Sequence, residues 1–113
     1  MSVVAPDIDR LLSALADPHR RGVIELLRRG PMRAGDLAGA LSLSAQAMSR
    51  HLRTLRQTGL VAEGHDGPDA RVRIYRLRPE TLGTLKTWLD ETEQLWSMQL
   101  AAFKSHVEVE EHP

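Results

Sequence analysis

The chain of 113 residues contains no cysteine. This absence excludes disulfide bonds, thiolate metal ligands and a cysteine nucleophile, and it makes the cytoplasm the default expected location. No apolar run approaches the roughly 20 residues that a membrane helix needs. The opening residues, MSVVAPDIDR, also lack the cationic start and long apolar stretch of a secretory signal. We therefore expect no membrane partner.

The motifs of common catalytic sites are missing as well. The sequence has no glycine-rich phosphate loop, no HExxH and no acidic pair at a useful spacing. Ser49 and His51 are two positions apart, so they cannot face each other on a helix as a nucleophile and its base. We predict that the protein is not an enzyme and has no catalytic residue and no cofactor.

Acidic residues are absent between Asp36 and Glu63, and charge is segregated along the whole chain. The segment 10–56 holds nine arginines against three acidic residues, a net +6, whereas 80–113 holds two lysines against seven acidic residues, a net −5. These opposite blocks lie behind a formal net charge of zero. The planar fork of arginine matches phosphate groups and guanine edges, so the basic block suits a nucleic-acid partner.

The segment 34–59 predicts two short helices joined by a tight turn, and the second helix, at 45–58, is purely cationic. Ser44 is a suitable N-cap for it, and Gly59 is suited to end it in a left-handed conformation. Its apolar residues share one side of the helix: Met48, Leu52 and Leu55. The flanks and the opposite side carry Ser49, Arg50, Arg53 and Arg56. This arrangement is what a helix-turn-helix needs to enter the DNA major groove.

Helices and a hairpin surround this motif. Apolar spacing predicts a helix over 8–15, and Asp17 and Pro18 are typical of the N-cap and first position of a second helix. Two β-prone segments, 60–63 and 71–77, flank the turn-rich residues 64–70 and predict a β-hairpin. A hairpin after a recognition helix is the wing of a winged helix, and we expect Arg71 and Arg73 to contact DNA from a wing at 64–73. The predicted fold is mainly α with this small β-hairpin.

A long helix over 79–106 completes the expected single domain, after a core at 8–78 and before a frayed tail at 107–113. Six apolar residues form one seam along the helix: Leu82, Leu85, Leu89, Trp96, Leu100 and Phe103. The small core cannot cover so much apolar surface. We therefore expect a symmetric homodimer in which this seam is buried.

Three segments together resemble bacterial ArsR-type winged-helix repressors: ALADPHRRGVIELL at 14–27, GDLAGALSLSAQAMSRHLRTLRQTGLV at 35–61 and RVRIYRL at 71–77. The resemblance implies a cytoplasmic homodimer, joined by its first and last helices, that binds a palindromic operator in double-stranded DNA. It adds Leu11 and Leu12 to the dimer interface. By matching positions it also implies groove contacts by Ser44, Gln46, Ser49 and Arg50, and a phosphate contact by Arg53.

Many members of that family release DNA on binding a metal, but the matching ligand positions are not filled here. Met32 to Gly35 stand where thiolate-sensing members have cysteines, and Asp90 is followed two places on by a threonine instead of a histidine. We expect no metal site. Two alternatives stay open: a metal-responsive repressor with a non-cysteine site, and a winged helix used only for protein contact. A tail set of His106, Glu110 and His112 is one possible non-cysteine site. The sequence does not indicate an inducer.

Overall fold

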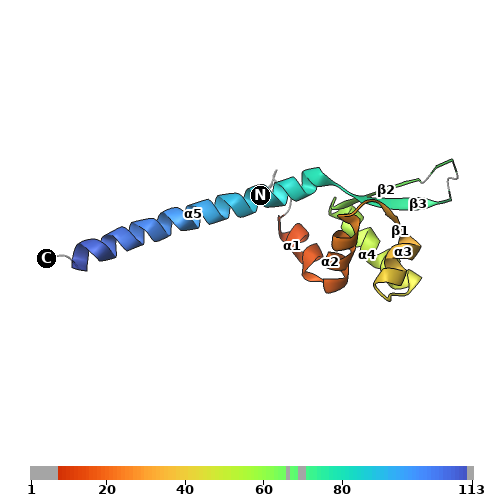
Figure 1. Ribbon diagram of the computed structural model, residues 1–113, viewed down its shortest axis with the longest axis horizontal. Helices are drawn as coiled ribbons and strands as arrows, with labels where there is room; N and C mark the ends of the chain where they lie inside the picture. Colours follow the sequence, from red (N-terminus) through yellow and green to blue (C-terminus); the bar gives the residue numbers. More distant parts are fainter. Residues whose placement is uncertain (1–7, 66, 69–70, 112–113) are drawn as a thin grey trace, which may run out of the picture.

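The structure is a computed structural model that describes residues 8–65, 67–68 and 71–111. Its elements in order are α1 (Ile8–Ala16), α2 (Pro18–Leu27), β1 (Met32–Arg33), α3 (Ala34–Ala40), α4 (Ala45–Gln57), β2 (Val61–His65), β3 (Arg73–Leu77) and α5 (Pro79–Glu111). The first four helices form a compact body, from which β2 and β3 extend to one side and α5 to the other (Figure 1). This architecture confirms the predicted winged helix-turn-helix.

The two predicted helix caps are present. The Asp17 carboxylate accepts hydrogen bonds from the backbone N–H groups of His19 and Arg20, at 2.8 and 3.2 Å, and Pro18 begins α2. The Ser44 hydroxyl accepts one from the Ala47 N–H at 3.1 Å and so caps α4. Both caps satisfy donors that would otherwise have no partner in the first turn.

Both helices of the helix-turn-helix end at a residue in the left-handed conformation. Gly59 follows α4 with φ of 79°, as predicted, and the next N–H, from Leu60, reaches back to the Leu55 carbonyl at 2.9 Å. Ser42 follows α3 with φ of 56°, although it carries a side chain. The turn at Ser42 reverses the chain within a few residues and so brings α3 and α4 into contact, whereas the turn at Gly59 leads from α4 into β2.

The sheet has three antiparallel strands in the order β1-β3-β2. Val61 pairs with Leu77 and Glu63 pairs with Tyr75 in the hairpin, and Met32 of β1 lies on the other side of Tyr75. The sequence predicted the hairpin but not β1. A strand of two residues carries no readable alternation, so only its pairing in the fold defines it.

The core lies between the helices and the sheet. Its members are at most 8% exposed: Leu11, Ala14, Val23, Leu27, Leu37, Ala38, Met48, Leu52, Leu55, Leu60, Val61 and Tyr75. Gly22 lets Leu41 approach α2, because a Cβ built on this glycine would lie 2.9 Å from the Leu41 Cδ2 atom. The helix-turn-helix is therefore held by apolar packing on its inner side.

Helix α5 has 33 residues and is about 50 Å long at ~1.5 Å per residue. Only its start packs on α1, and every residue from Lys86 to His106 is exposed. The helix continues to Glu111, so the expected frayed tail is corrected at 107–111, and residues 112 and 113 lie outside the described part. Within that part, no helix is long and apolar enough to cross a membrane.

Two residues that were expected in the dimer interface belong to the core of a single chain. Leu11 is 2% exposed and Leu85 is 9% exposed, so neither has much surface left for a partner. Leu82 packs against the same core and is partly buried. The expected interface is therefore corrected for Leu11 and Leu85, because α1 and the first turns of α5 cover each other.

Candidate nucleic-acid interface

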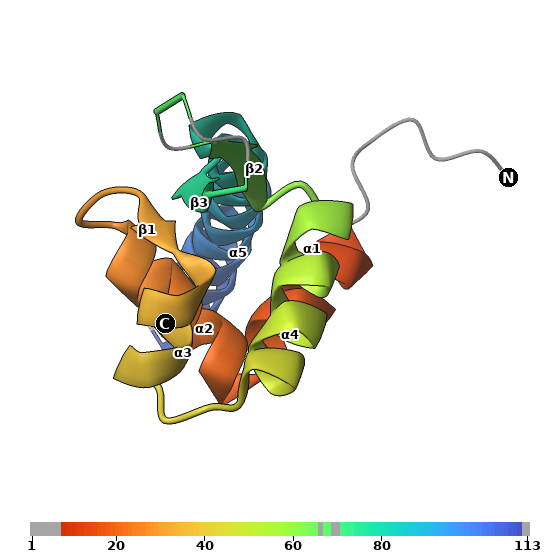
Figure 2. The same cartoon turned by 90° about the vertical axis from the view of Figure 1, so that its right-hand side faces the viewer.

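Four of the predicted DNA-binding residues share one outward arc of α4. Gln46, Ser49, Arg50 and Arg53 follow one another at intervals of three, one and three residues, which places them on one helical face. All four are exposed. The opposite face is buried in the core at 2% exposure or less, through Met48, Leu52 and Leu55. The core thus fixes which face of α4 is presented outward, and Figure 2 shows the helix at the surface of the body.

The two arginines of this arc are available to a ligand. Neither Arg50 nor Arg53 makes a hydrogen bond or ion pair with any other residue of the described ranges. Ser44 is also exposed, at the start of α4, although its hydroxyl oxygen already accepts the bond from Ala47. The outward face therefore combines two unpaired guanidinium groups with short polar side chains.

The next arginine of α4 is held by a carboxylate in the wing. Arg56 donates to Glu63 Oε1 at 2.5 Å, and Arg73 of β3 donates to Glu63 Oε2 at 2.8 Å. The Tyr75 hydroxyl donates to the same Oε2 at 3.3 Å. Glu63 thereby joins α4, β2 and β3 through one side chain, whose exposed fraction is only 16%.

The pKa of the Glu63 carboxyl reflects these contacts. Partial burial by itself raises the pKa, but the Arg73 hydrogen bond and the positive charges of Arg73 and Arg56 outweigh it, so the pKa lies below its ordinary value of 4.5. The pKa of Tyr75 is raised, first by burial and then by the Glu63 charge. Glu63 is therefore ionised at neutral pH and fixes the wing against α4. No sequence pattern indicates this cluster, because its members come from three elements.

The predicted wing residues have different surroundings. Arg71 and Arg73 are both exposed, and Arg73 is directed by its ion pair with Glu63. Part of the expected wing at 64–73, residues 66, 69 and 70, lies outside the described part of the chain. The structure thus places Arg73 on a strand that β2 and Glu63 hold beside α4.

Arginines of α2 serve a structural purpose behind the outward arc. Arg20 donates from Nε to the Ala14 carbonyl at 2.7 Å and from a terminal nitrogen to the Ser13 carbonyl at 3.2 Å. Its other terminal nitrogen lies 3.4 Å from His51 Nδ1. Arg20 thus caps the end of α1 and contacts α4. His51 is half-buried and lies on the side of α4 that contacts α2, away from the outward arc.

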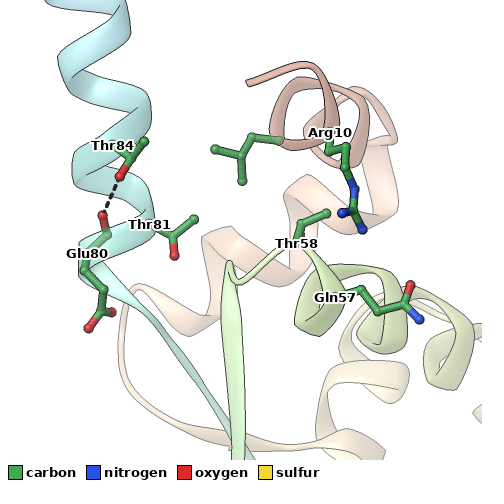
Figure 3. Close-up of a pocket in the computed structure, with 7 residues that line it drawn as sticks. Arg10, Gln57, Thr58, Glu80, Thr81 and Thr84 are labelled. Carbon is green, nitrogen blue, oxygen red and sulfur yellow. Dashed lines mark hydrogen bonds between the residues drawn. The ribbon is translucent and has the colours of Figure 1, made fainter. Parts of the chain in front are cut away.

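A hollow of about 300 Å³ lies where α1, the end of α4 and the start of α5 meet (Figure 3). Arg10, Gln57 and Thr58 line one side, and Thr81, Thr84 and Glu80 come from α5; the Thr84 hydroxyl donates to the Glu80 carbonyl at 3.2 Å. The hollow is at the opposite end of α4 from Ser44. It therefore does not form part of the outward arc.

Together, the outward cationic helix, its turn and the adjoining hairpin define a winged helix DNA-binding protein. Residues 15–63 match the family model described as a helix-turn-helix domain. The HTH-type transcriptional regulator Rv2034 of Mycobacterium tuberculosis is 37% identical over 90% of this chain and 90% of its own length. The transcriptional repressor SdpR of Bacillus subtilis is 33% identical over 73% of this chain and 88% of its own length.

A solved structure agrees with these relatives. An ArsR-like transcriptional regulator from Rhodococcus sp. RHA1 has a TM-score of 0.76 and 31% identity, over 87% of this chain and 90% of its own. The chain belongs to the ArsR family of winged helix-turn-helix transcriptional regulators. Membership confirms the predicted class of DNA-binding regulator and the prediction that the protein is not an enzyme.

Proposed function

We propose that the protein is a cytoplasmic repressor that binds a palindromic operator as a homodimer. Each α4 would enter the major groove of one half-site, and each wing would lie over the neighbouring backbone. The observation that carries the proposal is the outward arc of Gln46, Ser49, Arg50 and Arg53, opposite a buried apolar face. A similar protein, SdpR, is named a transcriptional repressor, which supports the direction of regulation.

The chemistry of each side chain gives it a role at the DNA. Arg50 matches the paired acceptors of guanine, and Gln46 matches the acceptor and donor of adenine. Arg53 and the short hydroxyls of Ser44 and Ser49 suit phosphate oxygens or groove edges. The first turn of α4 contains no acidic residue, so the positive end of its dipole adds attraction for phosphate.

The wing would supply the remaining contacts. Arg71 is exposed next to β3, and the Arg73 side chain is 62% exposed even while it is paired with Glu63. A phosphate near β3 would share the Arg73 guanidinium with the carboxylate, since its five N–H donors allow more than one acceptor. Glu63 would then orient Arg73 toward the backbone instead of neutralising it.

The exposed seam of α5 supports the homodimer. Leu89, Trp96, Leu100 and Phe103 are 50 to 65% exposed, and Leu12 of α1 is 40% exposed. Pairing of two such seams would hide several hundred Å² per chain, and at ~25 cal/mol per Å² this area is ample for stable association. The proposed interface therefore retains these five residues, with Leu82 at its edge.

Selection of bound duplexes from a random pool, followed by footprinting, tests this proposal. We expect an inverted repeat whose half-site centres are about 34–36 Å apart, one helical turn, with protection of both major-groove faces. Selection of a single unrepeated half-site, or no enrichment at all at low salt, would contradict operator binding by a dimer. A promoter fusion carrying the selected site should then be silenced by the protein.

A further inference from the structure

Three groups that can ligate a metal meet behind the outward arc of α4. Asp17 and His19 lie at the start of α2, and His51 lies in the middle of α4. One ligand atom from each residue lies within 4.8 Å of the other two. The two imidazole rings have centroids 5.7 Å apart. Among the residues that the structure describes, no other three histidine or carboxylate groups lie this close to one another.

The fold holds two of these groups and leaves the third adjustable. Asp17 is fixed as the N-cap of α2, where Oδ1 accepts the two backbone bonds and leaves Oδ2 for another partner. His51 is half-buried on α4, next to the core residue Leu52. The His19 side chain is 51% exposed, so its ring can rotate without disturbing the core.

The distances are within reach of a tetrahedral ion. Bonds of 2.0–2.1 Å hold ligand atoms roughly 3.3 Å apart in that geometry. The present separations of up to 4.8 Å must therefore shorten by about 1.5 Å at most. Rotation of the exposed His19 side chain can shorten its own distances to the other two groups. Two imidazoles and one carboxylate are a donor set that borderline divalent transition-metal ions accept.

We propose that Asp17, His19 and His51 form a site for a borderline divalent transition-metal ion such as Zn²⁺, with water in the fourth position. The site lies on the inner side of α4, so an ion there leaves Gln46, Arg50 and the rest of the outward arc uncovered. It joins the start of α2 to the helix that carries the arc. The proposal does not rest on operator binding, since it concerns this cluster alone.

The neighbouring arginine sets the condition for binding. The Arg20 guanidinium lies 3.4 Å from His51 Nδ1 and is an obligate donor. Coordination needs a neutral His51 ring. If the ion binds Nδ1, it takes the place of Arg20; if it binds Nε2, Nδ1 carries the proton and cannot accept from Arg20. The Arg20 contact must therefore open in both cases. Arg20 keeps its bonds to the carbonyls of Ala14 and Ser13. The ion would thus exchange one link between α2 and α4 for another.

Titration of the untagged full-length protein with Co²⁺, followed by displacement with Zn²⁺, tests the site. We expect visible absorption bands of a low-coordinate ion, saturating at one ion per chain, that Zn²⁺ removes. His19→Gln and Asp17→Asn should each lower the affinity by about tenfold or more. Asparagine is also a good N-cap, so Asp17→Asn removes the charge while it preserves the start of α2.

The matched control removes the histidines of the C-terminal tail. A His106→Gln, His112→Gln double variant should bind Co²⁺ like the parent chain, and thermal melts should show that all variants fold. Loss of binding in this tail variant, binding that is unchanged in His19→Gln and Asp17→Asn, or no saturable binding by the parent chain would each overturn the proposal.

Discussion

Arg50 and Arg56 show how the same side chain takes different roles six positions apart on one helix. Arg50 faces outward, with no hydrogen bond or ion pair to the rest of the described chain, whereas Arg56 is paired with Glu63. A free guanidinium gains its full set of partners from DNA. A paired one must first share or lose its carboxylate. Within α4, the position of Glu63 therefore separates the DNA-facing Arg50 from the structural Arg56.

Arg50→Ala should weaken binding to the selected operator and relax the base preference at one position in each half-site. Loss of one bidentate guanine contact is worth about 1–3 kcal/mol of discrimination. Competition binding against operators that vary at each position measures this effect. Arg56→Ala is the matched control, and it should leave the base preference as it was. An unchanged preference profile in Arg50→Ala would remove this residue from the proposed reading set.

Glu63→Gln should remove part of the acid sensitivity of folding. The folded-state pKa of Glu63 is lowered, so its ionised form contributes stability above the ordinary pKa of 4.5, and this contribution is lost as pH falls through the folded-state value. Denaturant unfolding at pH 7 and at pH 3.5 measures the change. The variant should be less stable at pH 7 than the parent, with a smaller difference at low pH.

Glu25→Gln provides the control for that experiment. Glu25 is paired with Arg28 on the surface of α2, where both side chains are more than 60% exposed. Exposed pairs contribute little, so this variant should unfold like the parent at both pH values. An equal pH dependence in the parent and in Glu63→Gln would show that the wing cluster does not stabilise the fold.

At the scale of the elements, the end of α4 depends on a glycine. Gly59 has φ of 79°, and a Cβ there would lie 3.3 Å from the Thr81 hydroxyl oxygen of α5. Gly59→Ala should therefore lower the free energy of unfolding by about 1–2 kcal/mol. Gly39→Ala is the counterpart in α3, where an added Cβ meets nothing within 4 Å and alanine favours the helix. Chemical denaturation compares the two, and equal stability would contradict the assigned turn.

The seam of α5 predicts the effect of charge on assembly. Leu89→Glu combined with Trp96→Glu places two negative charges per chain in the proposed interface, and should give folded monomers that bind the operator poorly. Sedimentation measures the mass, and far-ultraviolet circular dichroism checks the fold. Replacement of Glu91, which is exposed on the side of the same helix opposite Leu89 and Trp96, by glutamine is the control. A dimer that survives the first pair of changes would show that the seam lies elsewhere.

Periodicity predicted α1, α2, α3 and α4 well because each of them buries one apolar side. The spacing of Met48, Leu52 and Leu55 fixed the orientation of α4, and therefore its outward arc, before any tertiary contact was known. Pattern reasoning failed where chain geometry decides. It did not reveal β1, the pairing of Glu63 with two arginines, or the burial of Leu85 within a single chain. The convergence of Asp17, His19 and His51 was missed for the same reason, since His51 is far from the other two in the sequence.

On the scale of the whole molecule, the basic and acidic parts of the sequence occupy opposite ends of an elongated chain. The chain measures 76 × 33 × 24 Å, with the basic helical body and wing at one end and the acidic α5 extended from it (Figure 1). The acidic side chains of α5 are repelled by the phosphates of DNA, and its exposed apolar seam suits contact with a second copy of the chain. A dimer joined through α5 would present two cationic α4 helices to one duplex.

The most direct test of this account is the affinity of the dimer for duplex DNA across a series of salt concentrations, with the mass of the protein measured in the same buffers. If two subunits together contact some 6–10 phosphates, the affinity should fall by about 10³–10⁵ between 50 and 200 mM salt while the dimer persists. A monomer in solution, or an affinity that does not change with salt, would contradict the central claim.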